Sequence, residues 1–163
     1  MIFNQNICSM KKIFFFFLFV FIASVSFSQN TYKHALGLKF PGGFSATYKV
    51  FVTNTNNIEA QATVWNKGFR LSGMYEFNFY SFPTVENLSW FAGPGAHIGF
   101  WKSAYKADYN SNADLGIDGI IGLDYKFQKI PVNVSVDWQP SVTLAGNAGF
   151  TPAYGGFAVR YTF

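Results

Sequence analysis

Histidine, serine and the acidic residues are the side chains in this sequence that could carry out acid–base or nucleophilic chemistry. A hydrolase or acyl transferase of the nucleophilic type needs a hydroxyl within hydrogen-bonding reach of a general base. His97 is the only histidine expected in the middle of a strand, and Ser89, the serine on its own strand and face, is roughly 27 Å away at the rise of a β-strand. Gly99 occupies the position where a His-x-Ser motif would place a serine. A serine on another strand remains an alternative partner for His97. We expect His97 to pack in the interior, however, and we predict no catalytic residue.

Patterns for cofactors, metals and nucleic acids are missing from the sequence. Asp108, Asn110 and Asp114 are close together but lack the spacing of a calcium loop. No nucleotide-binding motif occurs, and the net charge of +4 is too small and too scattered for a nucleic-acid surface. We therefore predict that the protein is not an enzyme, has no cofactor and no metal site, and does not bind nucleic acid.

The charged residues alternate with small and polar ones on one face of the expected strands. Buried charges need partners, because an isolated charge is severely destabilising at low dielectric. We therefore predict a structural network of ion pairs inside the fold. Its members are Lys49, Glu59, Arg70, Glu76, Asp118, Asp124, Lys126, Asp137 and Arg160.

Strands must position these side chains. Successive side chains of a strand point to opposite faces, and alternation with period two runs through nearly all of the chain after residue 33. Clusters of Gly, Pro, Asn, Asp and Ser mark the turns between runs. The predicted strands are 33–40, 43–51, 57–65, 68–80, 88–101, 114–127, 131–142 and 155–163. This pattern predicts an all-β fold, an eight-stranded antiparallel up-and-down barrel. Pro94 and Pro140 both lack the N–H that a ladder needs, and we expect Pro94, between Gly93 and Gly95, to mark a bulge or bend.

The apolar face of the eight strands contains no Asp, Glu, Lys or Arg. The interior of an eight-stranded barrel is only just wide enough for side chains to fill it, so it cannot hold the large apolar residues of every strand. We therefore expect this face to point outward into lipid and predict a transmembrane barrel, closed because hydrocarbon penalises unpaired strand edges. The composition agrees, with 12% charged residues and with 4 Trp, 9 Tyr and 21 Phe.

The N-terminal segment is typical of a cleaved signal peptide. Lys11 and Lys12 precede an apolar run from Ile13 to Ala23, which is followed by small residues up to Ser28. We predict a signal peptide over 1–28, with Met10 as an alternative start, and a barrel domain over 29–163. The one cysteine, Cys8, lies in the leader, so the mature domain has no disulfide.

The ending Gly155-Gly156-Phe157-Ala158-Val159-Arg160-Tyr161-Thr162-Phe163, together with the leader and the strands, resembles the small outer-membrane barrels related to the OmpA membrane domain and OmpX. The stretch from Gly116 to Phe127 followed by Ile130-Pro131 is similar to uncharacterised members with no implied activity. This resemblance implies the outer membrane of a Gram-negative bacterium. It also implies that the barrel assembly machinery recognises alternate residues of the last strand, namely Phe157, Val159, Tyr161 and Phe163.

Three functions compete at this point. The first is a structural or surface-interacting barrel, whose partners are outer-membrane lipid and an unknown extracellular molecule at loops 102–113 and 143–154. The second is a lipid-modifying enzyme in the barrel wall. The third is a small-solute channel, which the narrow lumen disfavours. We expect the first.

Overall fold

The computed structural model describes residues 32–80, 82, 85–102, 112–146, 148–152 and 154–163. The predicted signal peptide over 1–28 and most of the loop 102–113 lie outside the described residues. The described part contains ten strand segments. They are β1 (His34–Phe40), β2 (Phe44–Phe51), β3 (Asn56–Trp65), β4 (Gly68–Phe79), β5 (Leu88–Trp101), β6 (Ala113–Lys126), β7 (Val132–Trp138), β8 (Ser141–Ala145), β9 (Gly149–Thr151) and β10 (Gly156–Thr162). Among these residues, no helix has the length and hydropathy needed to cross a membrane.

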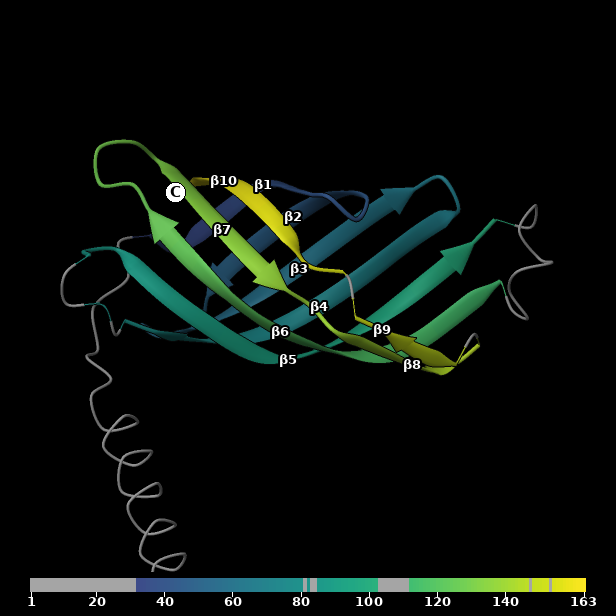
Figure 1. Cartoon of the computed structure of the whole chain (residues 1–163). Helices are drawn as coiled ribbons and strands as arrows, with labels where there is room; N and C mark the ends of the chain where they lie inside the picture. Colours follow the sequence, from purple (N-terminus) through teal and green to yellow (C-terminus); the bar gives the residue numbers. More distant parts are fainter. Residues whose placement is uncertain (1–31, 81, 83–84, 103–111, 147, 153) are drawn as a thin grey trace, which may run out of the picture.

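The segments form one closed antiparallel barrel of eight strands (Figure 1). Strands β1 to β6 each pair with the next, and β6 pairs with both β7 and β8, which are two parts of one barrel strand. The eighth barrel strand is formed by β9, which pairs with β8, and β10, which pairs with β7. The predicted all-β eight-stranded antiparallel barrel is therefore confirmed.

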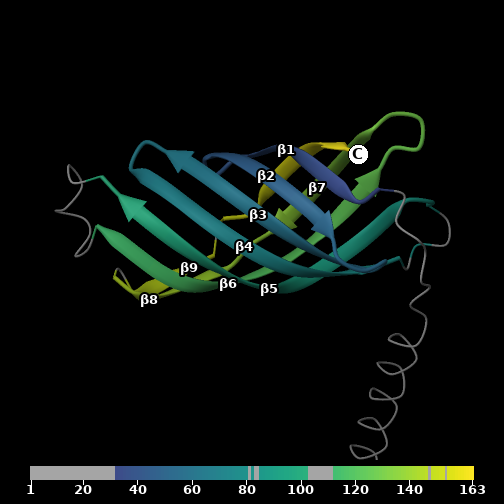
Figure 2. The same cartoon turned by 180° about the vertical axis from the view of Figure 1, so that it is seen from behind.

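The barrel closes where the first strand meets the last. Strand β1 pairs with β10 from Ala35 opposite Thr162 to Phe40 opposite Phe157. Beyond this ladder, His34 and Phe163 exchange two backbone hydrogen bonds of 2.9 Å each. We call the end of the barrel where β1 begins and β10 ends the terminal end, and the other the hairpin end. The view from behind shows the same closed wall (Figure 2).

The first six strands begin and end within one residue of their predicted limits, because turn residues mark their ends. The two-residue turn at Asn66 and Lys67 joins Trp65 to Gly68, which are paired. At the turn after β1, Gly42 and Gly43 have φ angles of 104° and 135°, which residues with a side chain rarely adopt. Strong local turn signals therefore explain why these limits were predictable.

The second half of the last hairpin differs from the prediction. The segment 143–154 was expected to be a loop, but it contains the end of β8 and all of β9. Gly146, with a φ of 89°, makes the turn between them. Alternation continues through Val142, Thr143 and Leu144, but the short, glycine-rich second strand gives too weak a period to recognise.

The two prolines act differently. Pro140 divides the seventh barrel strand into β7 and β8, because it supplies no N–H. Pro94 stays within β5 and remains opposite Gly119 of β6. On the β4 side the ladder opens at Gly93 and Pro94 but keeps one register, with Met74 opposite Gly95 and Phe77 opposite Ala92. No residue is inserted, so of the predicted bulge or bend the bulge is wrong, and the proline is accommodated by a local loss of pairing.

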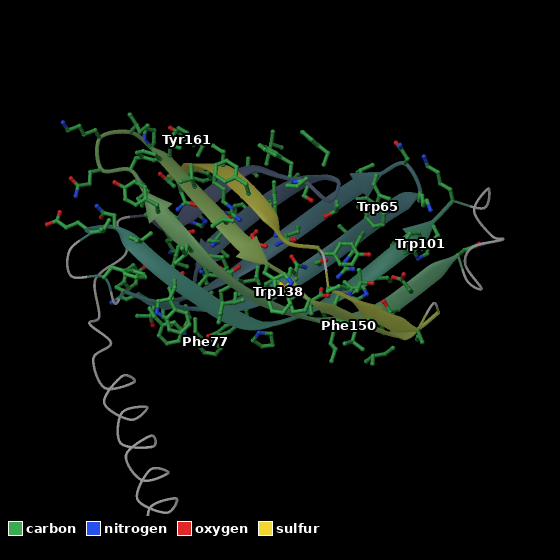
Figure 3. All side chains as sticks on the ribbon, viewed as in Figure 1. Trp65, Phe77, Trp101, Trp138, Phe150 and Tyr161 are labelled. Carbon is green, nitrogen blue, oxygen red and sulfur yellow. The ribbon has the colours of Figure 1, made fainter. Side chains whose placement is uncertain are left out.

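The two faces of the wall have opposite chemistry. Large apolar side chains cover the outside, where Leu36 is 54% and Ile117 is 53% exposed. Charged and polar side chains fill the inside, including Lys49 and Glu59, which are fully buried. Figure 3 shows Phe77 pointing away from the barrel, with nitrogen and oxygen atoms gathered between its walls, and Trp138 and Tyr161 are likewise exposed. The barrel is therefore apolar outside and polar inside.

Candidate functional site

The buried charges of the interior form two main groups. The terminal-end cluster comprises Lys49, Glu59, Glu76, Asp124 and Arg160. The hairpin-end cluster comprises Arg70, His97, Asp118 and Ser141. All of these residues are buried and come from strands on different sides of the barrel. The interior thus brings together charges that are far apart in the sequence.

In the terminal-end cluster, Arg160 and Lys49 hold the three carboxylates. Arg160 Nη2 donates to both oxygens of Glu59, at 2.8 and 2.9 Å. Lys49 Nζ lies 2.9 Å from Glu76 Oε2, 3.3 Å from Asp124 Oδ2 and 3.4 Å from Glu59 Oε2. The cluster therefore links β2, β3, β4, β6 and β10 across the lumen.

Neutral groups complete the shell of Arg160. Its Nε donates to Thr47 Oγ1 at 3.0 Å, and its Nη1 donates to Ser135 Oγ at 2.7 Å. Asn133 donates to Asp124 from Nδ2 and accepts from Arg160 at 3.4 Å. Tyr32, just before β1, has a buried hydroxyl at this end, and burial raises the pKa of that hydroxyl above its usual value. Sequence reasoning missed Asn133, because a lone polar residue on an inward face carries no special signal.

Lys126 is not part of the terminal-end cluster, contrary to the predicted network. Its Nζ donates to the carbonyl oxygens of Phe127, at 2.5 Å, and Ile130, at 3.0 Å. Lys126 is the last residue of β6, so its flexible side chain reaches the turn carbonyls at the rim instead of the lumen.

In the hairpin-end cluster, Arg70 and His97 share one carboxylate. Arg70 Nη2 lies 2.5 Å from Asp118 Oδ1 and donates to Ser141 Oγ at 3.0 Å. His97 Nδ1 lies 3.0 Å from the same Asp118 oxygen. The ring of Tyr154 covers the guanidinium of Arg70, with 4.0 Å from Cζ to the ring centroid.

Ser141 is the serine from another strand that the sequence left open as a partner of His97. Its Oγ lies 3.4 Å from His97 Nδ1, the nitrogen that also faces Asp118. A catalytic relay needs the nucleophile and the carboxylate on different ring nitrogens. Thr143 Oγ1 is 3.5 Å from the other nitrogen, Nε2, at the limit of a hydrogen bond. The arrangement therefore orients His97 but does not form a serine relay.

Asp137, the remaining member of the predicted network, forms a separate pair. Lys39 Nζ donates to Asp137 Oδ1 at 2.6 Å and to Gln139 Oε1 at 3.2 Å. Lys39 was on the inward face of its predicted strand, which was the available signal, but it was not included in the network.

Little free space remains in this part of the lumen. A void between Lys39, Arg70, Gln139 and Tyr154 has a volume of about 10 Å³, which is close to the space of one water molecule. Met74, Phe91 and Ile120 form a buried apolar group on the side of the lumen made by β4, β5 and β6. Within the described residues, no group of three or more His, Cys, Asp or Glu side chains could hold a metal ion.

Aromatic side chains gather at both ends of the barrel. At the hairpin end, Trp65 and Trp101 continue the inward-facing alternation of β3 and β5 and pack edge to face with centroids 5.5 Å apart (Figure 3). Trp101 Nε1 donates to the buried Asp114 Oδ2 at 2.6 Å. At the terminal end, Phe163 stacks on His34 at 5.5 Å and on Tyr161 at 6.2 Å. Together with Phe157 and Val159, the last two aromatic residues place the predicted assembly signal on the outer face of β10 and its end.

Fold and interior define the class of protein. This chain is a small, closed, antiparallel β-barrel of eight strands with a charged, side-chain-filled interior. No protein-family model and no curated protein matches the sequence.

Proposed function

We propose that this protein is an integral outer-membrane β-barrel of a Gram-negative bacterium, with a structural or surface-interaction role and no catalytic activity. The single observation that supports this proposal best is the reversal of the usual distribution of side chains. The outer wall is covered by exposed large apolar residues, while ten Asp, Glu, Lys and Arg residues are buried inside. A barrel in water would expose those charges and bury the apolar residues.

Hydrocarbon is the solvent that suits this outer wall. A spanning strand needs about 9–11 residues when tilted, and β3 to β6 have between 10 and 14. Closure of the sheet leaves no continuous open edge to lipid, which a membrane would penalise. An outer groove of about 780 Å³ with a largely apolar lining includes the directly paired Ala60, Gly73 and Ala96. Acyl chains could fill such a groove.

Export, orientation in the membrane and binding partners are part of the same proposal. The segment 1–28 would direct export and be removed, and both ends of the barrel domain would then lie in the periplasm. The outer face of Phe157, Val159, Tyr161 and Phe163 would be read by the barrel assembly machinery, as in the barrels related to OmpA and OmpX. Outer-membrane lipid would surround the wall, and the hairpin end would face the outside of the cell.

Lipid modification is the alternative with a specific observation behind it. His97 lies between Asp118, at 3.0 Å, and Thr143, at 3.5 Å, on different ring nitrogens. However, the His97 side chain is fully buried, so a lipid ester in the wall would have no access to it. Comparing lipid A acylation in cells with and without the protein distinguishes this alternative from the proposal.

A matched pair of variants tests insertion into lipid. Ile117, in the middle of β6, and Ile130, in the turn after it, are 53% and 49% exposed. If the wall faces lipid, Ile117→Arg lowers the free energy of unfolding in vesicles by about 2–4 kcal/mol, and Ile130→Arg by about 0–1 kcal/mol. Equal, small effects of the two arginines, or recovery of the wild-type protein in the soluble fraction of cells, would refute the proposal.

A further inference from the structure

The charges of the terminal-end cluster do not balance. Two cations, Lys49 and Arg160, face three carboxylates, those of Glu59, Glu76 and Asp124, and all five side chains are buried. Neighbouring cations do not supply the missing charge, because Lys39 is bound to Asp137 and Arg70 to Asp118. An uncompensated buried charge is strongly destabilising. One further positive charge is therefore needed in this part of the lumen.

The three carboxylates are bound unequally. Glu59 receives both bonds from Arg160 and one from Gln61 at 3.2 Å. Asp124 receives bonds from Lys49 and Asn133. Glu76 has only Lys49 near Oε2, and its other oxygen, Oε1, has no donor within the described structure. Glu76 is thus the carboxylate with a free oxygen.

Asn57 is the residue paired with Glu76 on the neighbouring strand. It is fully buried, and neither its Oδ1 nor its Nδ2 has a hydrogen-bond partner among the described residues. Asn57 of β3 and Glu76 of β4 are directly opposite in the ladder, and both side chains point inward. Side chains in that relation have Cβ atoms about 4.5–5.5 Å apart. Two buried side chains, each with an oxygen that has no donor among the described residues, are therefore neighbours on the inner face of the ladder.

We propose that Glu76 and Asn57 form a proton-binding site. A proton on Glu76 Oε1 is donated to Asn57 Oδ1. This one proton balances the terminal-end cluster and gives partners to two buried oxygens that otherwise have none. Lys49 remains beside the other oxygen of Glu76, at 2.9 Å.

The described buried groups of the terminal-end part of the lumen come from every element that lines it. They are Tyr32 before β1, Lys49 on β2, Asn57 and Glu59 on β3, Ser89 and Phe91 on β5, Asp124 on β6, Asn133 on β7 and Arg160 on β10. Among the described residues of this cluster, the second cation, Arg160, is paired with Glu59. Bound in this way, the proton makes the folded barrel hold one more proton than the unfolded chain at neutral pH, so acidification from neutral pH stabilises the fold.

Infrared spectroscopy of the purified full chain in detergent micelles tests the site directly. The sequence has three glutamates, Glu59, Glu76 and Glu86, so ¹³C-glutamate labelling isolates their signals. We expect an acid C=O band at neutral pH in the wild type, which disappears in Glu76→Gln, shifts in Asn57→Ala and persists in Glu86→Gln. No labelled acid band in the folded wild-type protein would overturn the proposal, even if Glu76→Gln failed to refold.

Stability measurements give a second, independent readout. In the pH range where a glutamate of the unfolded chain is ionised and folded Glu76 is protonated, each unit of increase in pH should raise the unfolding equilibrium constant of the wild type about tenfold relative to that of Glu76→Gln. Identical pH dependence of the two proteins would overturn the proposal. So would a wild-type stability that depends on sodium or potassium concentration at constant ionic strength and is insensitive to pH, since an alkali ion would then supply the charge.

Discussion

Replacement of Arg160 by alanine is the most demanding test of the interior. Arg160 is 1% exposed and donates to Glu59, Thr47 and Ser135. Its removal leaves Glu59 buried with only Lys49 Nζ, at 3.4 Å, and the amide of Gln61, at 3.2 Å. Removing one partner of a buried ion pair costs about 3–5 kcal/mol. We expect Arg160→Ala to lower the free energy of unfolding by that amount, measured by urea unfolding in micelles with tryptophan fluorescence.

Lys102→Ala is the matched control, because Lys102 is an exposed cation just after β5. Its replacement should change stability by no more than about 0.5 kcal/mol. The double variant Arg160→Met with Glu59→Gln removes both charges, so it should be less destabilised than the sum of the two single variants. Equal losses for Arg160→Ala and Lys102→Ala, or strict additivity in the double variant, would refute the view that buried charge pairing holds the lumen together.

Two further changes probe the wall and the last strand. A Cβ at Gly37 would overlap the Val159 carbonyl and the Arg160 backbone, whereas one at Gly73 would meet nothing within 4 Å. Gly37→Ala should therefore cost about 1–3 kcal/mol in urea unfolding and Gly73→Ala far less; the reverse order would contradict the register at the closure of the barrel. Phe163→Ala should reduce membrane insertion in cells, scored by heat-modifiable migration on gels, more than it reduces the stability of refolded protein. An unchanged yield in cells would argue against a role of Phe163 in assembly.

The strands of the barrel wall and their inner and outer faces could be predicted from the sequence. Period-two alternation gives the face of each residue, and short turns such as Asn66-Lys67 determine the register of neighbouring strands. The first six strands were therefore predictable. The break at Pro140 and the short β9 were missed, because a three-residue strand between glycines has no readable period.

The contacts across the lumen were much less predictable. Lys39 and Asp137 are 98 positions apart, and Arg160 and Glu59 are 101 positions apart. Which of them meet depends on the tilt and stagger of the closed barrel, a global property that no single hairpin contains. The contact between Ser141 and His97 was unpredictable for the same reason, since it requires the registers of β5, β6 and β8 together. Alternation predicts that these side chains lie inside the barrel, but it does not predict which of them form pairs.

The joint between β1 and β10 has a consequence for how the molecule is made. β1 is the first and β10 the last strand of the described chain, and the junction between them, from His34–Phe163 to Phe40–Phe157, joins residues more than 100 positions apart in the sequence. Closing so long a loop is entropically costly and slows folding. Until the barrel closes, the sheet has two edge strands with unpaired backbone groups, which can pair with other chains. We therefore expect the unclosed sheet to need protection from other chains until β1 pairs with β10. Deletion of either strand would leave the barrel unable to close.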